Sequence, residues 1–453
     1  MANGWRSLME RMGHLFASRR WRVARNGVLA GLLAGSASVA YRWMIAHGTA
    51  IAHLAYQTIG RRPLWMLAWT ASALLVAVAV RQVLRWEPTS SGSGIPQVKG
   101  ILQHRMALRP LHVLAARFCG GAGGALFGLS LGREGPSIHI GAAAADLLAR
   151  PMGATPQERD QLITSGAAAG LSAAFNAPVS GMVFGIEGLH RNFSPLVVVS
   201  ASTGALAADV VSTLAFGTRP ILQFGASAGS LSGAGAATPG EIPLSQLWVV
   251  LPLGILAGLV GALMNRALLG AQALSRLPGP LPVLVALAAA LPCGLWAPRV
   301  LGGGEDLIEW AEVGSIGLGA VLVALAAKLA LTTVSFGSGV PGGIFMPILA
   351  IGTLTGAGYA LGAQALGLSG DLRMALAVCG MAGVLAASVR TPLTSILLTA
   401  EMTGTLGRLL PVATVVIMSI FTADALRVPP IYDALLQRSL SGGSPAPAPS
   451  SRD

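Results

Sequence analysis

The chain has 453 residues, of which 53% are hydrophobic and only 11% are charged, and its mean hydropathy is +0.67. This composition excludes a soluble globular protein and indicates a polytopic membrane protein. The net charge of +12 comes almost entirely from arginines spread along the chain, which predicts loop charges and helix-end anchors rather than a nucleic-acid interface.

The first apolar run, residues 27–46, directly follows an arginine cluster within residues 19–25. The run is long for the core of a signal peptide and lacks a convincing cleavage site, so we expect a retained first span. The cluster predicts that residues 1–26 form a cytoplasmic N-terminal segment. Three isolated cysteines in apolar segments argue against a disulfide framework and against a zinc site: Cys119, Cys293 and Cys379.

A second span is expected over residues 63–84, followed by the glycine-rich stretch 90–96. Irregular backbone at membrane depth survives only where protein buries it or where it lines a watery cavity, and the alternative is a loop at the membrane surface. Residues 111–131 are again apolar and rich in glycine. They contain Arg117, which is either an intramembrane charge or one that snorkels to the surface.

Residues 132–141, with the sequence GREGPSIHIG, form a charged interruption bounded by glycines. Pro136 suits the first turn of a helix, where its missing N–H costs nothing. The stretch therefore predicts a helix N-terminus aimed into a cavity, which would attract anions. The Glu134 carboxylate could occupy that anion site as a plug, or it could only complement the helix dipole.

The remaining apolar segments divide the chain into two membrane repeats. Residues 167–188 predict two helices broken around 176–178, and further spans are expected at 196–216, 247–269 and 281–301, before a polar loop that contains Glu305. Later apolar segments run to about residue 425, with breaks at 337–347 and 390–392. We therefore expect a first repeat at 27–216, a linker at 217–245, a second repeat at 246–440 and a disordered tail at 441–453.

An internal repeat relates these halves. Pro136 and Pro347 each precede a glycine by five residues and differ by 347 − 136 = 211 positions, while Pro178 and Pro392 each precede a glutamate by nine and differ by 392 − 178 = 214. Two similar offsets imply duplicated halves, with a site at their interface near mid-membrane. Glycine-rich breaks at 92–96, 132–136 and 339–347 would direct N–H groups at one spot, which favours an anion over a cation.

Four motifs in order resemble those of the CLC chloride channels and proton/chloride antiporters: GSGIP at 92–96, GREGP at 132–136, GIFMP at 343–347 and PIYDAL at 430–435. The resemblance covers the chain from the first span to about residue 440. It implies an all-α polytopic membrane protein of two inverted-topology repeats with broken, re-entrant helices. It also implies a homodimer with one pore per subunit in the cell membrane, the inner membrane in a bacterium, with cytoplasmic termini and no cofactor or metal.

Carried over to this sequence, the resemblance implies that a dehydrated chloride ion is held by the hydroxyls of Ser93 and Tyr432 and the backbone N–H groups of Ile344 and Phe345. Glu134 would be the gating glutamate. The other residues of the anion-site loops would be Gly92, Gly94, Arg133, Gly135, Gly343 and Met346. The alternatives are that Ser93 only caps a helix and that Tyr432 is only an interfacial aromatic residue.

One position departs from the antiporter pattern, because the internal proton-transfer glutamate of the family falls at Gly188. Glycine has no group to titrate. Glu187 or His190 could form another proton path, or water could enter the space that glycine leaves, although we favour Glu187 and Glu401 as braces for their helices. We therefore expect chloride transport with proton coupling absent or altered, and the alternative is a coupled antiporter with another proton route.

A remote alternative is an integral-membrane enzyme that acts on lipid-borne substrates. Such an enzyme would need a cluster of acidic or histidine side chains. The seven histidines are scattered along the sequence. We therefore expect a transporter and not an enzyme, with chloride, protons and the lipid bilayer as partners and no nucleic acid.

Overall fold

The computed structural model describes residues 19–191, 193–218, 221–222, 242, 244–312, 316–367, 372–404 and 409–441, and these residues form helices and connecting loops without a β-strand. The helices of the first half are α2 (Arg19–Arg61), α3 (Trp65–Trp86), α4 (Ile95–Leu102), α5 (Pro110–Ala125), α6 (Glu134–Ala149), α7 (Pro156–Phe175), α8 (Pro178–Phe184) and α9 (Pro195–Phe216). The helices of the second half are α10 (Val250–Ala271), α11 (Leu281–Trp296), α12 (Glu305–Glu312), α13 (Leu318–Gly337), α14 (Phe345–Ala365), α15 (Arg373–Val389), α16 (Pro392–Thr403), α17 (Leu409–Ala425) and α18 (Ile431–Ser441).

Six of the described helical stretches are long and apolar enough to cross a membrane, and they contain α2, α3, α9, α10, α13 and α14. The predicted first span is only the middle of α2, which continues for 43 residues. No proline interrupts residues 19–61, so nothing in the backbone ends the helix at the predicted place. The predicted end of the span at residue 216 matches the end of α9.

The predicted polar loop after residue 301 is wrong, because residues 305–312 form helix α12. Its first residues, Glu305 and Asp306, are acidic and complement the positive end of the helix dipole. Leu307, Ile308 and Ala311 are buried against the rest of the protein. The acidic residues of this segment therefore belong to an amphipathic helix, not to a solvated loop.

The broken helices lie where the sequence predicts them. Helix α7 ends at Asn176 with φ 49° and helix α15 ends at Arg390 with φ 62°, and in both places a new short helix starts two residues later with a proline in its first turn. A proline is tolerated there because the first N–H groups of a helix have no partner within the helix. The two breaks differ by 390 − 176 = 214 positions, the offset seen in the sequence.

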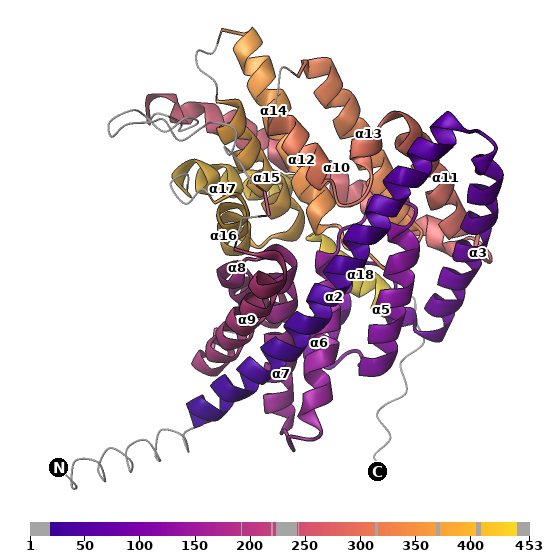
Figure 1. Cartoon of the computed structure of the whole chain (residues 1–453). Coiled ribbons are helices and arrows are strands. Elements are labelled where there is room, and N and C mark those ends of the chain that lie inside the picture. The colour runs from indigo at the N-terminus through magenta and orange to yellow at the C-terminus, as the bar shows by residue number, and fades with distance from the viewer. Residues whose placement is uncertain are drawn as a thin grey trace.

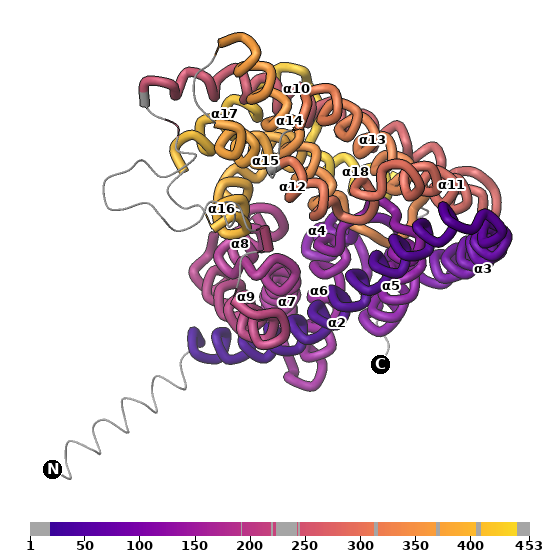
Figure 2. Tube along the Cα trace, turned by 45° about the horizontal axis from the view of Figure 1, so that its top comes forward, coloured from indigo at the N-terminus to yellow at the C-terminus, as the bar shows by residue number. Residues whose placement is uncertain are grey.

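Two glutamates cross-link the halves in a reciprocal way. Glu187 accepts hydrogen bonds from the backbone N–H groups at the start of α16, at 3.1 Å from Leu393 and 2.8 Å from Thr394. Glu401 of α16 does the same at the start of α8, at 3.1 Å from Val179 and 2.7 Å from Ser180. Helices α8 and α16 lie side by side in both views (Figures 1 and 2). Symmetric partners thus cap each other, and the duplicated halves are confirmed.

The last helix returns to the first half. In Figure 2 the yellow α18 lies between second-half helices such as α12 and α13 and the first-half helix α4, and it packs against α4 and α10. The starts of α4, α6, α14 and α18 therefore converge near the middle of the protein. The predicted linker lies mostly outside the described residues, and of the predicted tail only Ser441 is described.

Candidate anion site

The three glycine-rich breaks meet through backbone hydrogen bonds. Gly132 and Gly343 each donate an N–H group to the carbonyl oxygen of the other at 2.7 Å. Gly92 donates to the carbonyl of Gly339 at 3.3 Å and accepts from the N–H of Gly342 at 3.2 Å. The loops that precede α4, α6 and α14 are thus one connected unit, as the sequence predicts.

This unit directs three helix N-termini at the same region. Helix α4 follows Gly94 in a left-handed conformation with φ 97°, helix α6 starts at Glu134, and helix α14 starts at Phe345. The first N–H groups of each helix lack intrahelical partners, and each N-terminus carries roughly half a positive charge. The close approach requires glycine at position 135, where a Cβ atom would lie 2.5 Å from the Ser93 hydroxyl. The region is therefore electropositive without a cationic side chain at its centre.

Two buried hydroxyl groups point into this region. Ser93 is 2% exposed and Tyr432 is 4% exposed, and neither hydroxyl has a hydrogen-bond partner of normal geometry within the described part of the chain. The two side chains nevertheless face each other. A buried hydroxyl without a partner costs about 1–3 kcal/mol. Ser93 does not cap α4, and Tyr432 is not at the protein surface. The alternatives of a helix cap for Ser93 and an interfacial aromatic residue for Tyr432 are therefore wrong.

Glu134 is also buried, at 1% exposure, and does not face lipid. Its carboxylate interacts with the backbone N–H of Met346 at the start of α14. Its second oxygen, Oε2, lies against Gly132, where a Cβ atom would clash with it. A carboxylate therefore sits at the N-terminus of α14, in the position where an anion would be attracted.

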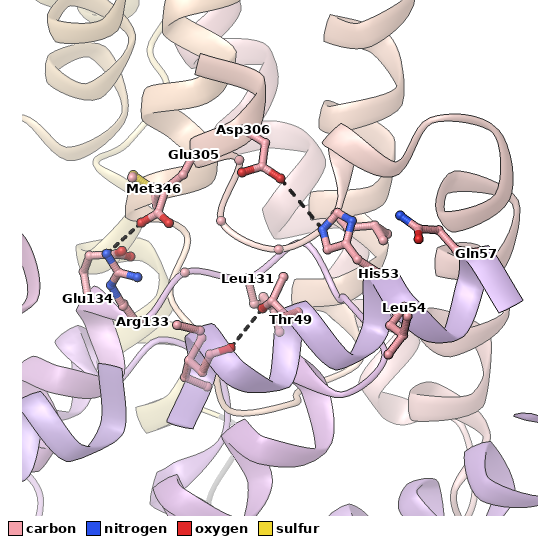
Figure 3. A pocket seen from close by; sticks show the side chains of 18 residues that line it. Thr49, His53, Leu54, Gln57, Leu131, Arg133, Glu134, Glu305, Asp306 and Met346 are labelled. Carbon is pink, nitrogen blue, oxygen red and sulfur yellow. Dashed lines mark hydrogen bonds and ion pairs between the residues drawn. The ribbon is translucent and has the colours of Figure 1, made fainter. Parts of the chain in front are cut away.

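The loops separate two cavities. Glu134 lines a cavity of about 500 Å³ together with Arg133, Glu305 and His53, shown in Figure 3 and named here the Glu134 cavity. Ser93 lines another cavity, of about 780 Å³, named here the Ser93 cavity. Among the described residues, none lines both cavities. An anion moving from one to the other would have to pass the converging loops.

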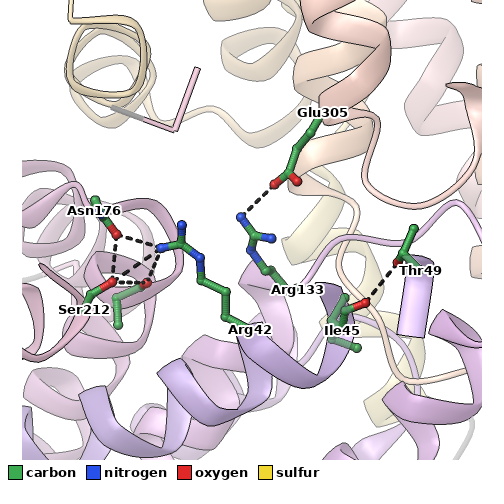
Figure 4. A network of polar contacts seen from close by, with 8 residues as sticks. Arg42, Ile45, Thr49, Arg133, Asn176, Ser212 and Glu305 are labelled. Carbon is green, nitrogen blue, oxygen red and sulfur yellow. Dashed lines mark hydrogen bonds and ion pairs between the residues drawn. The ribbon is translucent and has the colours of Figure 1, made fainter. Parts of the chain in front are cut away.

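Arg133 next to Glu134 is paired with a carboxylate from the second half of the chain. Its Nη2 lies 2.7 Å from Oε1 of Glu305, which begins α12 (Figure 4). Arg133 is 8% exposed and Glu305 is 38% exposed at the side chain, so the pair lies at the boundary between protein and cavity. The charge of Arg133 is thus largely offset. Nothing in the sequence pattern marks Glu305 as a site residue, because it lies 305 − 134 = 171 positions after Glu134 in the chain.

Arg117 holds the first glycine-rich loop through hydrogen bonds to its backbone. It is fully buried and donates hydrogen bonds to the carbonyl oxygens of Gly92 and Thr89 and to Nδ1 of His139. Arg117 therefore does not snorkel to the surface, because its side chain is buried inside the protein. Its contacts fix the backbone that carries Ser93.

The residue after Tyr432, Asp433, forms two ion pairs that hold the start of α18 in place. Asp433 forms ion pairs with Lys99 of α4 and with Arg191, the latter at 2.7 Å. The Lys99 side chain is only 4% exposed, so the pair joins the start of α18 firmly to α4, which carries Ser93 at its entrance. The sequence pattern alone does not single out Asp433, although it lies within the PIYDAL motif at 430–435.

Gly188, which takes the place of the family's proton-transfer glutamate, lies in a π-helical turn, Gly185–His190. A Cβ atom on Gly188 would lie 2.7 Å from the ring of Phe184, so that ring fills the space that glycine leaves. The Phe184 ring packs edge to face on Phe345 with centroids 5.7 Å apart. The Phe184 ring therefore occupies the position of the absent Cβ atom, while Gly188 itself is half-buried.

The two candidate proton-path residues have different surroundings. Glu187 is engaged as the cap of α16. His190 places Nδ1 2.9 Å from the Thr164 hydroxyl and interacts electrostatically with Asp160, whose carboxylate lies 3.3 Å from Nε2 of the exposed His104. Titratable groups thus run from the surface to His190.

Comparison with known proteins gives a consistent result. A family model described as voltage gated chloride channel matches residues 72–424. The H(+)/Cl(-) exchange transporter ClcA of Cronobacter sakazakii is 36% identical over 435 residues, which cover 91% of this chain and 89% of that protein. The protein of the same name from Klebsiella pneumoniae subsp. pneumoniae is 35% identical over 426 residues, with coverage of 92% and 87%.

Solved structures show the same architecture. The crystal structure of a slow cyanobacterial Cl−/H+ antiporter matches with a TM-score of 0.82 and 29% identity, over 93% of this chain and 98% of that chain. A eukaryotic CLC transporter matches with a TM-score of 0.72 and 21% identity, over 93% and 75%, which supports the fold alone.

Proposed function

Because the chain belongs to the CLC family of voltage gated chloride channels and transporters, we propose that it carries chloride across a membrane through the site between Ser93 and Tyr432. The observation that carries the proposal is the pair of buried hydroxyls without partners, placed beside the N-terminus of α14. Two O–H donors and the N–H groups of Ile344 and Phe345 would replace the water lost by a chloride ion. No cation is needed at the centre, so the ion is held without being trapped.

Glu134 acts as the gate in this proposal. Its carboxylate interacts with the N–H of Met346, next to the N–H groups of Ile344 and Phe345 that would hold chloride, so it competes with an anion for the same helix N-terminus. An incoming anion or a proton releases the carboxylate, and the path between the Ser93 cavity and the Glu134 cavity opens. Chloride and Glu134 thus exclude each other from one position, and transport becomes faster as pH falls.

Proton coupling is absent or altered in this proposal, because Gly188 replaces a titratable group and Phe184 fills the adjoining space. Coupled exchange of protons and chloride through another route is the second candidate. It is favoured by the names of the relatives, which are H(+)/Cl(-) exchange transporters, and by the row of His104, Asp160 and His190 that leads inward from the surface. The two candidates differ only in whether protons move.

One experiment tests the proposal and separates the two candidates. Purified protein in liposomes is subjected to opposed chloride and pH gradients, and the reversal potential is measured with external chloride and pH sensors. A potential at the chloride equilibrium value supports uncoupled transport, whereas a potential that shifts with the pH gradient supports exchange. If Glu134→Gln leaves both the rate and its pH dependence unchanged, the gate assignment is wrong.

The remaining architecture follows the same proposal. Residues 27–216 and 246–440 form the two membrane repeats, joined by a linker at 217–245, and two copies of the chain form a homodimer with one pore in each. The segment before residue 27 and the tail after residue 440 lie on the cytoplasmic side, since the arginines within residues 19–25 precede the first span. Cysteine accessibility at both ends tests this orientation.

A further inference from the structure

A third cavity lies away from the chloride path, at the start of α5 and the end of α6. Its volume is about 630 Å³, and its wall contains Arg109, His112, Arg150, Arg159 and Asp146 beside several leucines. We name it the arginine cavity. Helix α6 places Arg150 at the end opposite Glu134, so the cavity is separate from the proposed gate.

The arginine cavity carries an uncompensated positive charge. Arg159 binds the Asp146 carboxylate with two hydrogen bonds, of 2.6 and 3.1 Å. The side chains of Arg109 and Arg150 are exposed, and their guanidinium groups have no hydrogen bond or ion pair with any described residue. With Arg159 neutralised by Asp146, two guanidinium groups remain free. Guanidinium groups bind phosphate oxygens through pairs of parallel N–H donors.

The cavity also lies at the level where a membrane span ends. His112 in its wall stacks on Trp86, the last residue of span α3, with ring centroids 4.7 Å apart. Trp86 is 50% exposed, as expected for a tryptophan at the boundary between lipid and water. Leu111, also in the wall, is 66% exposed and offers an apolar surface next to the charges. In Figure 1 the end of α3, the start of α5 and the turn between α6 and α7 face the same lower side.

We propose that the arginine cavity binds the phosphate group of an anionic phospholipid, with the acyl chains against Leu111 and the adjoining surface of α3. Charge and depth together favour a lipid over a dissolved phosphate compound. The free guanidinium groups can donate hydrogen bonds to the lipid phosphodiester, and the exposed leucine and tryptophan offer apolar contacts to the lipid acyl chains. This side also carries the start of α2, where the arginines predict the cytoplasmic leaflet.

The test measures retention of a defined lipid by the full chain. Protein is purified, depleted of native lipid, exchanged into nanodiscs with phosphatidylcholine and phosphatidylglycerol, then returned to detergent for native mass spectrometry. The variant Arg109→Gln/Arg150→Gln removes the free charges. The matched control is Arg61→Gln/Arg62→Gln, which removes two exposed arginines at the other end of α3.

Wild type and control are expected to retain phosphatidylglycerol in preference to phosphatidylcholine. The R109Q/R150Q variant should bind it about 25-fold more weakly, since each arginine near a membrane contributes about fivefold. Equal retention by all three proteins would overturn the proposal, as would displacement of the lipid by millimolar inorganic phosphate, which would indicate a soluble ligand. Chloride efflux in pure phosphatidylcholine should be the same for all three, so this result is distinguishable from failure of the chloride site.

Discussion

Gly132 and Gly343 exchange two backbone hydrogen bonds and are 343 − 132 = 211 positions apart, which is the offset that relates Pro136 to Pro347 in the internal repeat. Symmetry-related residues of the two halves therefore pair directly with each other. A residue can contact its own symmetry mate only near the axis that relates the two halves. The proposed chloride site thus lies beside that axis, where each half contributes one helix N-terminus.

The glycine at position 135 is expected to be essential for anion binding. In Gly135→Ala the new Cβ atom would lie 2.5 Å from the Ser93 hydroxyl, so the loops must separate. Overpacking of this kind costs typically 1–3 kcal/mol, and we expect chloride affinity to fall about tenfold or more by isothermal titration calorimetry. Gly362→Ala in α14 is the control, because nothing lies within 4 Å of its Cβ position. Unchanged affinity in G135A would contradict the placement of the site.

The reciprocal caps predict equal losses of stability. Glu187→Ala and Glu401→Ala each leave two backbone N–H groups without an acceptor at the start of the mate's helix. Each substitution should lower the free energy of unfolding by about 1–3 kcal/mol, measured by thermal unfolding in detergent. Glu187→Gln and Glu401→Gln then separate roles. If only the Glu187 variant reduces proton movement, Glu187 belongs to a proton path; equal behaviour of the pair indicates a cap alone.

A glutamate at position 188 would need space that the Phe184 ring now occupies. We expect Gly188→Glu alone to give unstable protein or no gain of proton coupling, because its side chain would collide with the Phe184 ring. The double variant Phe184→Ala/Gly188→Glu removes the obstacle and should move the reversal potential further towards coupled exchange than Phe184→Ala does. A gain of coupling in Gly188→Glu alone would show that the ring yields easily.

The ion pair at the Glu134 cavity is expected to slow chloride entry. Glu305→Gln removes the carboxylate that offsets Arg133 and leaves a positive charge beside the path. Because Glu305 is partly exposed and screened, we expect an increase of chloride flux of no more than about fivefold at low ionic strength, and a smaller one at 0.5 M salt. Glu309→Gln on the same helix is the control, since Glu309 does not line the cavity.

The cap of α7 predicts a pH-dependent stability. Hydrogen bonds from the backbone N–H and the hydroxyl of Thr155 lower the pKa of Glu158 below its ordinary value. A carboxylate with a lowered pKa stabilises the fold above its unfolded pKa of about 4.3, and this contribution is lost as pH falls through the folded value. Thr155→Ala should cost about 1 kcal/mol at pH 7, and the difference in melting temperature from wild type should shrink towards pH 4. A difference that grows on acidification would contradict this account.

Much of the architecture could be predicted from local sequence signals. Prolines mark the helix starts, and the breaks at Asn176 and Arg390 each lie two residues before such a proline. Together with the two offsets, these local signals predict the repeats and the convergence of three loops. The length of α2 did not, because a helix without proline ends only where packing ends.

The site could be predicted where a motif carries it, and not where distant segments meet. Ser93, Glu134 and Tyr432 lie inside motifs and are brought to one region by the structure. Glu305, by contrast, reaches Arg133 from another helix, and the Phe184 ring packs on Phe345 from the other half of the chain. Contacts of this kind depend on the three-dimensional arrangement and have no local signature.

The position of Tyr432 in α18 has a consequence for biosynthesis. A ribosome produces Ser93, Glu134 and Phe345 well before it reaches Tyr432, and the Lys99 pair that fixes α18 forms only after the second half is made. A nascent chain without α18 therefore lacks one wall of the proposed chloride site. The last helix, α18, therefore completes the proposed site only after both halves of the chain have been made.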